Sequence, residues 1–381
     1  MANLEACLVG AVRRCVPRPA IYSWLPPAQP HGTAVDVPLP AVGENVAIRA
    51  WVTDHSQVWV PSTEARALIV AAPSRGRLAA DFNCLIPGLV TAGYRTAVID
   101  YPGYSPRYSL EAAQAAGPFT LERLADEIAE VARALRREGE PVVLLGWAFG
   151  NRPVRMAAHR HPELARAVVV VSAGQQPGFT PDVKLALMAV FQGAPTVGMP
   201  MYAAAVRYSC LFSPEGAPPA PVPPELCCAT DCTPAVQKLL GEAKRPSEPG
   251  DHAWVAAGGR PLLCIGGVAD RIAPPRTAGH ALLESLGSEQ VRVVDIEGAA
   301  HMVPLEKPSE TIAAIVRFLD EELAKEEAPP QPAGRHPSLK AAVSALLLSG
   351  ALKEMVEADE ARRHTGDEDE PEDDAERAHQ F

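Results

Sequence analysis

Short apolar runs recur along the chain and constrain its fold more than any other feature. They lie at Ala67–Ala71, Thr96–Asp100, Val142–Leu145, Ala167–Ser172 and Leu262–Gly266. Each run is too short for a buried helix, and strands that are covered on both faces have this composition. Stretches with helical patterning lie between them, and such alternation is typical of helices packed on both faces of a parallel sheet. The sequence therefore predicts an α/β fold with a doubly wound, mostly parallel sheet.

Further elements are predicted around these runs. Val35–Leu39 and Val46–Val52 are expected to form an antiparallel hairpin ahead of the first parallel strand. Thr120 is the expected N-cap of a helix that continues to Leu135. The remaining predicted elements are helices at Phe82–Ala92, Asn151–His161, Arg276–Leu286 and Ser309–Lys325, and a strand at Val291–Ile296.

The alternation stops between Gly174 and Gly259, where prolines gather and no clean strand is found. A long irregular insertion at this point predicts a cap over the sheet edge at which ligands bind. Beyond the core, apolar residues at helical spacing from Leu339 to Val356 indicate an amphipathic helix. The predicted organisation is an N-terminal arm (1–33), a core (34–174 and 260–326), the cap (175–259), a linker (327–337), the amphipathic helix (338–357) and an acidic disordered tail (358–381).

The net charge of −11 is concentrated at the C-terminal end. Residues 357–381 contain 11 acidic and 3 basic residues, so the rest of the chain is close to neutral. Without a basic cluster, nucleic acid is not an expected partner. Arg13 and Arg14 follow the short apolar run Leu8–Val12 instead of preceding it, and no run reaches transmembrane length. We therefore expect a cytoplasmic protein with no membrane partner; the sequence does not indicate what the amphipathic helix and the tail bind.

The eight cysteines do not form a metal-binding pattern. Cys84 and Cys264 lie in apolar segments, which is typical of buried thiols. Four others are closer together but lack both CxxC-type spacing and a histidine in register: Cys210, Cys227, Cys228 and Cys232. We therefore expect no metal ion and no other cofactor.

A glycine-flanked turn, Gly146-Trp147-Ala148-Phe149-Gly150, joins an expected strand to an expected helix. The pattern Gly-x-Ser-x-Gly in this setting is typical of a nucleophile elbow, whose sharp turn presents a catalytic hydroxyl. Ala148 stands where that serine is expected, and its side chain has no hydroxyl. An acyl-enzyme at this position is therefore excluded.

Two loops after later strands carry groups suited to acid–base chemistry. Asp270 follows the strand at Leu262–Gly266, and His301 follows the strand at Val291–Ile296. Asp270 would accept a hydrogen bond from His301, fix the tautomer of the ring and stabilise its charged form. His301 would then act as a general base.

The elbow and these two loops resemble those of the α/β-hydrolase fold superfamily, in the family's order of nucleophile, acid and histidine. The resemblance spans about Val35 to Glu326, and the elbow also looks like that of a branch with Ala at the nucleophile position. It implies the hydrolase sheet with an inserted cap. Ser105 and Cys84 are not expected to replace the missing nucleophile, because neither lies on a strained turn.

The resemblance also implies an oxyanion hole formed by backbone N–H groups. One would be the N–H of Phe149, at the start of a helix. The other would come from Ser74 or Arg75, in a loop that lacks the His-Gly pair of most relatives. The expected substrate pocket includes Trp147, Tyr104 and Met302.

Three hypotheses about function follow. The first is a hydrolase-like enzyme, of hydrolase or base-catalysed lyase type, in which His301 acts as a base on a small carbonyl or ester compound, without an acyl-enzyme. The second is a ligand-binding protein without catalysis, and the third is a serine esterase or other hydrolase whose elbow serine has been replaced by Ala148. The first is favoured because a binder needs neither Asp270 nor His301. The expected ligand is small, apolar and carbonyl-bearing.

The cap offers apolar side chains that either line such a pocket or pack on one another. These are Leu185, Leu187, Met188, Val190, Phe191, Met199, Met201 and Tyr202.

Overall fold

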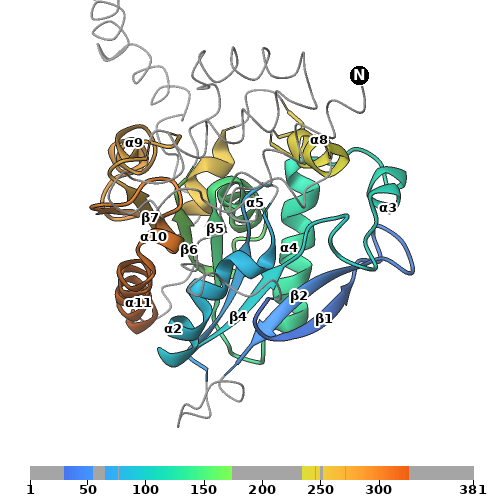
Figure 1. The fold of residues 1–381 in the computed structure, drawn as a ribbon, viewed down its shortest axis with the longest axis horizontal. Coiled ribbons are helices and arrows are strands. Elements are labelled where there is room, and N and C mark those ends of the chain that lie inside the picture. Colours follow the sequence, from blue (N-terminus) through green and yellow to red (C-terminus); the bar gives the residue numbers. More distant parts are fainter. Residues whose placement is uncertain are drawn as a thin grey trace, which may run out of the picture. The chain divides into compact units, whose positions relative to one another are not determined.

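Eight strands form one sheet in the part of the chain that the computed structural model describes, residues 30–54, 65–75, 77–173, 234–244, 246–248, 252–270 and 272–325 (Figure 1). The strands are Thr33–Pro38 (β1), Ala47–Thr53 (β2), Ala67–Ala72 (β3), Tyr94–Ile99 (β4), Val142–Trp147 (β5), Ala165–Val171 (β6), Leu262–Gly267 (β7) and Val291–Ile296 (β8). Their order across the sheet is β1-β2-β4-β3-β5-β6-β7-β8. β2 is antiparallel to both β1 and β4, and all other neighbours are parallel. The predicted doubly wound, mostly parallel sheet is therefore confirmed, as is its antiparallel entry hairpin.

Helices cover both faces of this sheet (Figure 1). Their bounds are Ile86–Thr91 (α2), Leu110–Ala115 (α3), Leu121–Leu135 (α4), Asn151–Arg160 (α5), Pro234–Glu242 (α8), Gly279–Leu286 (α9), Val303–Glu306 (α10) and Pro308–Ala324 (α11). Short 3₁₀ segments lie at Ala79–Cys84 (η2), Ala148–Gly150 (η3), Ala253–Gly259 (η6) and Pro275–Thr277 (η7). Buried residues of α4 and α5 form one apolar layer with the sheet, and those of α2 and α11 form the other.

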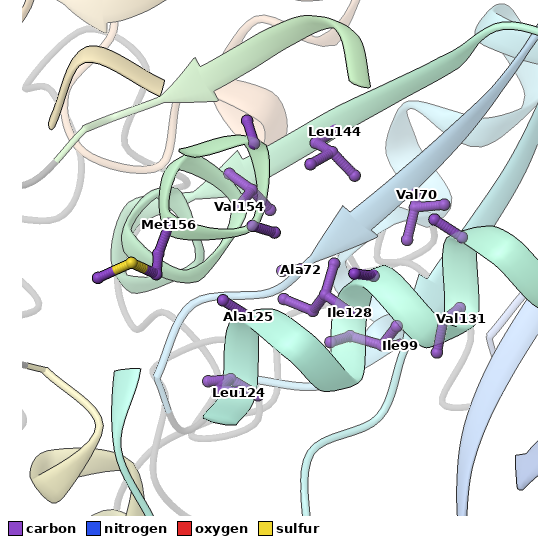
Figure 2. Packing of buried hydrophobic residues seen from close by; sticks show 14 of the residues in the cluster. Val70, Ala72, Ile99, Leu124, Ala125, Ile128, Val131, Leu144, Val154 and Met156 are labelled. Atoms are coloured by element: carbon purple, nitrogen blue, oxygen red, sulfur yellow. The ribbon is translucent and has the colours of Figure 1, made fainter. Parts of the chain in front are cut away.

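The burial of β3 explains why the central strands are apolar throughout. Leu68, Val70 and Ala72 belong to the layer of α4 and α5, whereas Ala67, Ile69 and Ala71 belong to the layer of α2 and α11. Successive side chains of a strand point to opposite faces, so both sets are buried. Figure 2 shows part of the first layer, in which Val70 and Ala72 of β3 and Ile128 of α4 belong to one cluster of buried side chains.

Two predicted helices are divided in the structure. The stretch Phe82–Ala92 contains the end of η2 and then α2, with Leu85 (φ −101°, ψ −37°) between them. Pro87 is the second residue of α2 and has no N–H to donate to the preceding turn, so a helix cannot continue through it with all its hydrogen bonds. The predicted helix Arg276–Leu286 is likewise divided into η7 and α9 at Ala278.

Several predicted segments lie outside the described residues. They are the N-terminal arm up to residue 29, the cap between 174 and 233, the linker, the amphipathic helix and the tail. Of the predicted cap, the structure describes α8 and η6, and Trp254 of η6 is buried in the same layer as α5. None of the described helices combines the length and the apolar character that crossing a membrane requires.

Helix α4 begins where Thr120 caps it and carries a buried carboxyl group in its interior. The Thr120 hydroxyl oxygen accepts a hydrogen bond from the Arg123 N–H at 3.3 Å, which confirms the predicted N-cap. Glu127 Oε1 accepts hydrogen bonds from the Tyr108 hydroxyl and from Arg123 Nε. Burial nevertheless raises the pKa of Glu127 to about 7, against the lowering effect of these two partners.

This carboxyl group should make the stability of the protein depend on pH. Between pH 4.5, the ordinary pKa, and about 7, the folded protein holds a proton on Glu127 that the unfolded chain has lost. The contribution of Glu127 to stability therefore falls as the pH rises through this window, on the order of 2–3 kcal/mol in total. In Glu127→Gln this fall should disappear, as measured by urea unfolding at pH 5 and pH 7.5. Glu130→Gln, on the exposed face of α4, should retain it. Equal pH dependence in the two variants would contradict the assignment.

Candidate active site

Asp270 and His301 form a buried pair at the carboxyl ends of β7 and β8. His301 Nδ1 lies 2.8 Å from Asp270 Oδ2, and the two side chains are 10% and 0% exposed. The other carboxylate oxygen, Oδ1, accepts the backbone N–H groups of Ile272 at 2.8 Å and Ala273 at 2.9 Å. Both oxygens of Asp270 are therefore hydrogen-bonded, which holds the His301 ring in one orientation. The structure thus brings together the acid and the base that the sequence predicted.

Ala148 lies at the tip of a strained turn between β5 and α5. Its φ is +46°, a left-handed conformation that costs a residue with a Cβ about 1–2 kcal/mol. The glycines on either side leave room for the chain to turn: a Cβ on Gly146 would lie 2.5 Å from the carbonyl carbon of Gly150. The backbone at Ala148 therefore makes the sharp strand-to-helix turn expected of a nucleophile elbow, but the side chain at its tip is a methyl group instead of a hydroxyl.

Gly150 also brings the start of α5 against the loop after β3. A Cβ on Gly150 would lie 2.1 Å from the Ala72 carbonyl oxygen, so this approach depends on glycine. The Tyr101 hydroxyl donates to the Pro73 carbonyl oxygen at 2.6 Å, and the Tyr101 ring packs edge-on against Phe149 with ring centroids 5.9 Å apart. The two segments expected to supply the oxyanion hole are therefore held next to each other.

The second expected donor loop contains Ser74 and Arg75. Ser74 is half-buried, and its carbonyl oxygen accepts the N–H of Arg77 at 3.0 Å. Arg77 in turn forms a buried ion pair with Asp81, with 2.5 Å between Nε and Oδ2. The Arg75 guanidinium extends toward α8, where it lies 3.6 Å from the position that a Cβ on Gly241 would take. A backbone donor from Ser74 remains the prediction for this loop.

Two side chains outside the predicted set of site residues hold the histidine loop in place. Ser172, at the end of β6, is fully buried with a φ of +47°, and its hydroxyl donates to the His301 carbonyl oxygen at 2.7 Å. Glu306 Oε2 accepts the Ala300 N–H at 2.6 Å. A signal for Ser172 existed, since it is a polar residue at the carboxyl end of an apolar strand that neighbours β7.

Neither of the residues considered as substitute nucleophiles has a free reactive group. The Ser105 hydroxyl accepts the Arg49 N–H at 2.7 Å and donates to the Ala47 carbonyl oxygen at 3.1 Å, so it ties its loop to β2. The Cys84 thiol contacts the Asp81 carbonyl oxygen at 3.2 Å, and burial raises its pKa to about 12. A thiol with such a pKa is protonated near neutral pH and is a poor nucleophile.

The residues expected to line the pocket are mostly buried in the core. Trp147 is 1% exposed and packs edge-on against Phe82, with ring centroids 5.9 Å apart. Met302 is 4% exposed and belongs to the same apolar layer, while Tyr104 is half-buried. Their part in a pocket stays a prediction, because the cap residues named as its possible lining lie outside the described residues.

No three His, Cys, Asp or Glu side chains are grouped to hold a metal ion within the described ranges. Cys264 is a buried free thiol, as predicted, whereas Cys84 is a free cysteine that is only partly buried. The four clustered cysteines lie outside the described residues.

Comparisons with known proteins agree with this arrangement. The model of the Alpha/beta hydrolase family matches residues 69–315. No curated protein matches the chain. Among solved structures, a thermophilic esterase from Thermogutta terrifontis, solved with malate bound, is similar with a TM-score of 0.57 and 19% identity, covering 76% of this chain and 99% of its own.

Two other solved structures show the same fold with different named activities. A carboxylesterase from Bacillus subtilis is similar with a TM-score of 0.52 and 17% identity, covering 78% of this chain and 94% of its own. A bromoperoxidase from Bacillus anthracis is similar with a TM-score of 0.55 and 15% identity, covering 76% of this chain and 100% of its own. At these identities the structural similarity establishes only the shared fold. The family match covers more than half of the chain and therefore establishes family membership. The chain belongs to the alpha/beta hydrolase family.

Proposed function

We propose that this protein is a hydrolase-like enzyme in which His301 acts as a general base on a small, apolar carbonyl or ester compound, without an acyl-enzyme. The observation that carries the proposal is the buried Asp270–His301 pair, with 2.8 Å between Oδ2 and Nδ1. Burying a carboxylate is costly unless its oxygens are hydrogen-bonded. Here Ile272 and Ala273 satisfy one oxygen and His301 the other. A protein that only bound a ligand would have no need of such an arrangement.

The chemistry of the site follows from this pair. Because Nδ1 donates to Asp270, Nε2 of His301 carries the lone pair that can accept a proton. In ester hydrolysis Nε2 takes a proton from a water molecule as the water oxygen bonds to the carbonyl carbon. The oxyanion that forms is stabilised by the N–H of Phe149 and an N–H of the loop at Ser74. The imidazolium then returns the proton to the leaving alkoxide, which gives an acid and an alcohol.

A pair of variants tests this proposal on p-nitrophenyl esters of short acyl chains. His301→Ala should lower kcat about 10²–10⁴-fold, the usual contribution of a general base. Ala148→Ser should not raise kcat, because the reaction does not pass through an acyl-enzyme. His280→Ala is the matched control, since His280 also contacts an aspartate, with 2.6 Å between its Nε2 and Asp295 Oδ2, but lies half-exposed on α9.

The other two hypotheses predict different outcomes. If the elbow serine has been replaced, Ala148→Ser gives strong esterase activity with a covalent acyl adduct that mass spectrometry detects. If the protein only binds its ligand, neither the wild type nor Ala148→Ser turns over an ester, and a ligand that co-purifies still binds to His301→Ala. Either result would contradict the proposal.

A further inference from the structure

Arg155 is a buried cation near the middle of α5. Arg155 is 2% exposed, and among the described residues its guanidinium donates to two carbonyl oxygens and one amide oxygen instead of a carboxylate. Burial lowers the pKa of Arg155 to about 10, so the guanidinium still carries its charge near neutral pH. A buried charge without an opposite charge is expensive, and its contacts should explain why the fold accepts it.

The guanidinium connects η6 with the first residue of α5. On one side it lies 4.9 Å from the ring centre of Trp254, and its Nη1 donates to the Val255 carbonyl oxygen at 3.4 Å. On the other side Nη2 donates to Asn151 Oδ1 at 2.6 Å, and Nε donates to the Asn151 carbonyl oxygen at 3.3 Å. Arg155 therefore holds the Asn151 side chain as well as its backbone.

Asn151 passes this contact on to the elbow. Its side chain is fully buried, and its Nδ2 donates to the Ala148 carbonyl oxygen. Since arginine can only donate, the contact with Arg155 requires the amide oxygen on that side. The amide nitrogen then necessarily faces the Ala148 carbonyl group. Arg155 thus determines which end of the Asn151 amide meets the turn.

The Ala148 carbonyl group and the Phe149 N–H belong to the same peptide unit. In a trans peptide they point in opposite directions, so a hydrogen bond that fixes one also aims the other. The Ala148 carbonyl oxygen also accepts the backbone N–H of Asn151, so the Asn151 side chain is a second donor to this group. Ala148 has a φ of +46°, a strained conformation that surrounding contacts must hold. The chain of donors from Arg155 through Asn151 also polarises the peptide and strengthens its N–H as a donor.

We infer that Arg155 is a positioning residue that acts through Asn151 to aim the Phe149 N–H as the oxyanion donor. The inference rests on the proposed function, in which that N–H stabilises the oxyanion. It adds a second consequence: η6, the last segment of the predicted cap before β7, is tied to the elbow through the same guanidinium.

The backbone amide of Phe149 provides a test that needs no substrate. The protein is labelled with ¹⁵N-phenylalanine, which gives eight amide signals, and the Phe149 signal is identified with Phe149→Leu. Asn151→Asp keeps an acceptor for Arg155 and supplies an opposite charge, but it removes the side-chain donor to the Ala148 carbonyl oxygen. The Phe149 amide signal should therefore move in Asn151→Asp and in Arg155→Lys. It should not move in Arg160→Gln, an exposed arginine of the same helix that pairs with Asp126.

A thiol placed at the elbow gives a second readout. In Ala148→Cys the thiol pKa is measured from the pH dependence of its alkylation, and donors at a helix start lower that pKa. Adding Arg155→Lys keeps the positive charge but loses the planar fork, and should raise the thiol pKa by about one unit. If Arg155 acted only through its charge, this substitution would leave the thiol pKa unchanged, and the inference would be wrong.

The two readouts also separate this inference from the proposed function. If no ester is turned over but the Phe149 signal moves as expected, the positioning role stands and the proposed function fails. If turnover depends on His301 but not on Asn151 or Arg155, and the Phe149 signal stays in place while the melting temperature falls, Arg155 has only a structural role.

Discussion

Asp270→Asn is expected to lower kcat about 10³–10⁴-fold with little change in KM, because it reverses the tautomer of His301. The reason lies in the other carboxylate oxygen. Ile272 and Ala273 both donate to Oδ1, so an asparagine at this position must place its amide oxygen there. Its NH₂ group then faces His301 Nδ1 and donates to it. The ring proton then lies on Nε2. The nitrogen that should accept a proton from water therefore has no free lone pair.

The tautomer can be measured directly by ¹⁵N NMR of the His301 ring, whether or not a substrate is known. Asp295→Asn is the matched control, because Asp295 also contacts a histidine, His280, but on the partly exposed face of β8. Asp295→Asn should leave both the His301 tautomer and turnover unchanged. If Asp270→Asn retains the wild-type tautomer or full turnover, His301 does not act as the base.

The sheet could be predicted from the sequence because burial on both faces leaves a plain signature. All six residues of β3 are buried, and its predicted end differs from the observed one by a single residue. β5 continues two residues beyond its predicted end, to Trp147, because the chain turns only where φ becomes positive at Ala148. The order of the strands across the sheet could not be predicted in this way. No local pattern shows that β4 lies between β2 and β3.

The candidate site could be predicted only where a motif marks it. Asp270 and His301 follow strands that are neighbours in the sheet, and the structure brings them within hydrogen-bonding distance. The residues that hold the site carry no such mark. Ser172 contacts a carbonyl group 129 residues away, and Arg155 contacts one 100 residues away. These contacts depend on how distant segments meet, which periodicity and spacing do not encode.

Gly150→Ala should be the most destabilising substitution at the elbow, with a loss of at least about 3 kcal/mol in the free energy of unfolding. The backbone of Gly150, with a φ of −56° and a ψ of −21°, suits any residue, so the need for glycine is purely one of space. A Cβ there would lie 2.1 Å from the Ala72 carbonyl oxygen and 2.8 Å from the Pro73 carbonyl oxygen. Both are backbone atoms, which cannot move aside as a flexible side chain can. Urea unfolding measures the loss.

Gly241→Ala in α8 is the matched control for this prediction. Its added Cβ would lie 3.6 Å from the Arg75 guanidinium, an ordinary contact, so helix propensity should dominate and stabilise the protein by about 0.5–1 kcal/mol. Gly150 is the N-cap residue of α5, where alanine gains no such propensity over glycine, and a Cβ added there would overlap β3 and the following loop. A variant Gly150→Ala as stable as Gly241→Ala would mean that α5 does not start against the loop after β3. The Phe149 N–H and the loop at Ser74 would then have no common support, and the proposed oxyanion hole would lose its structural basis.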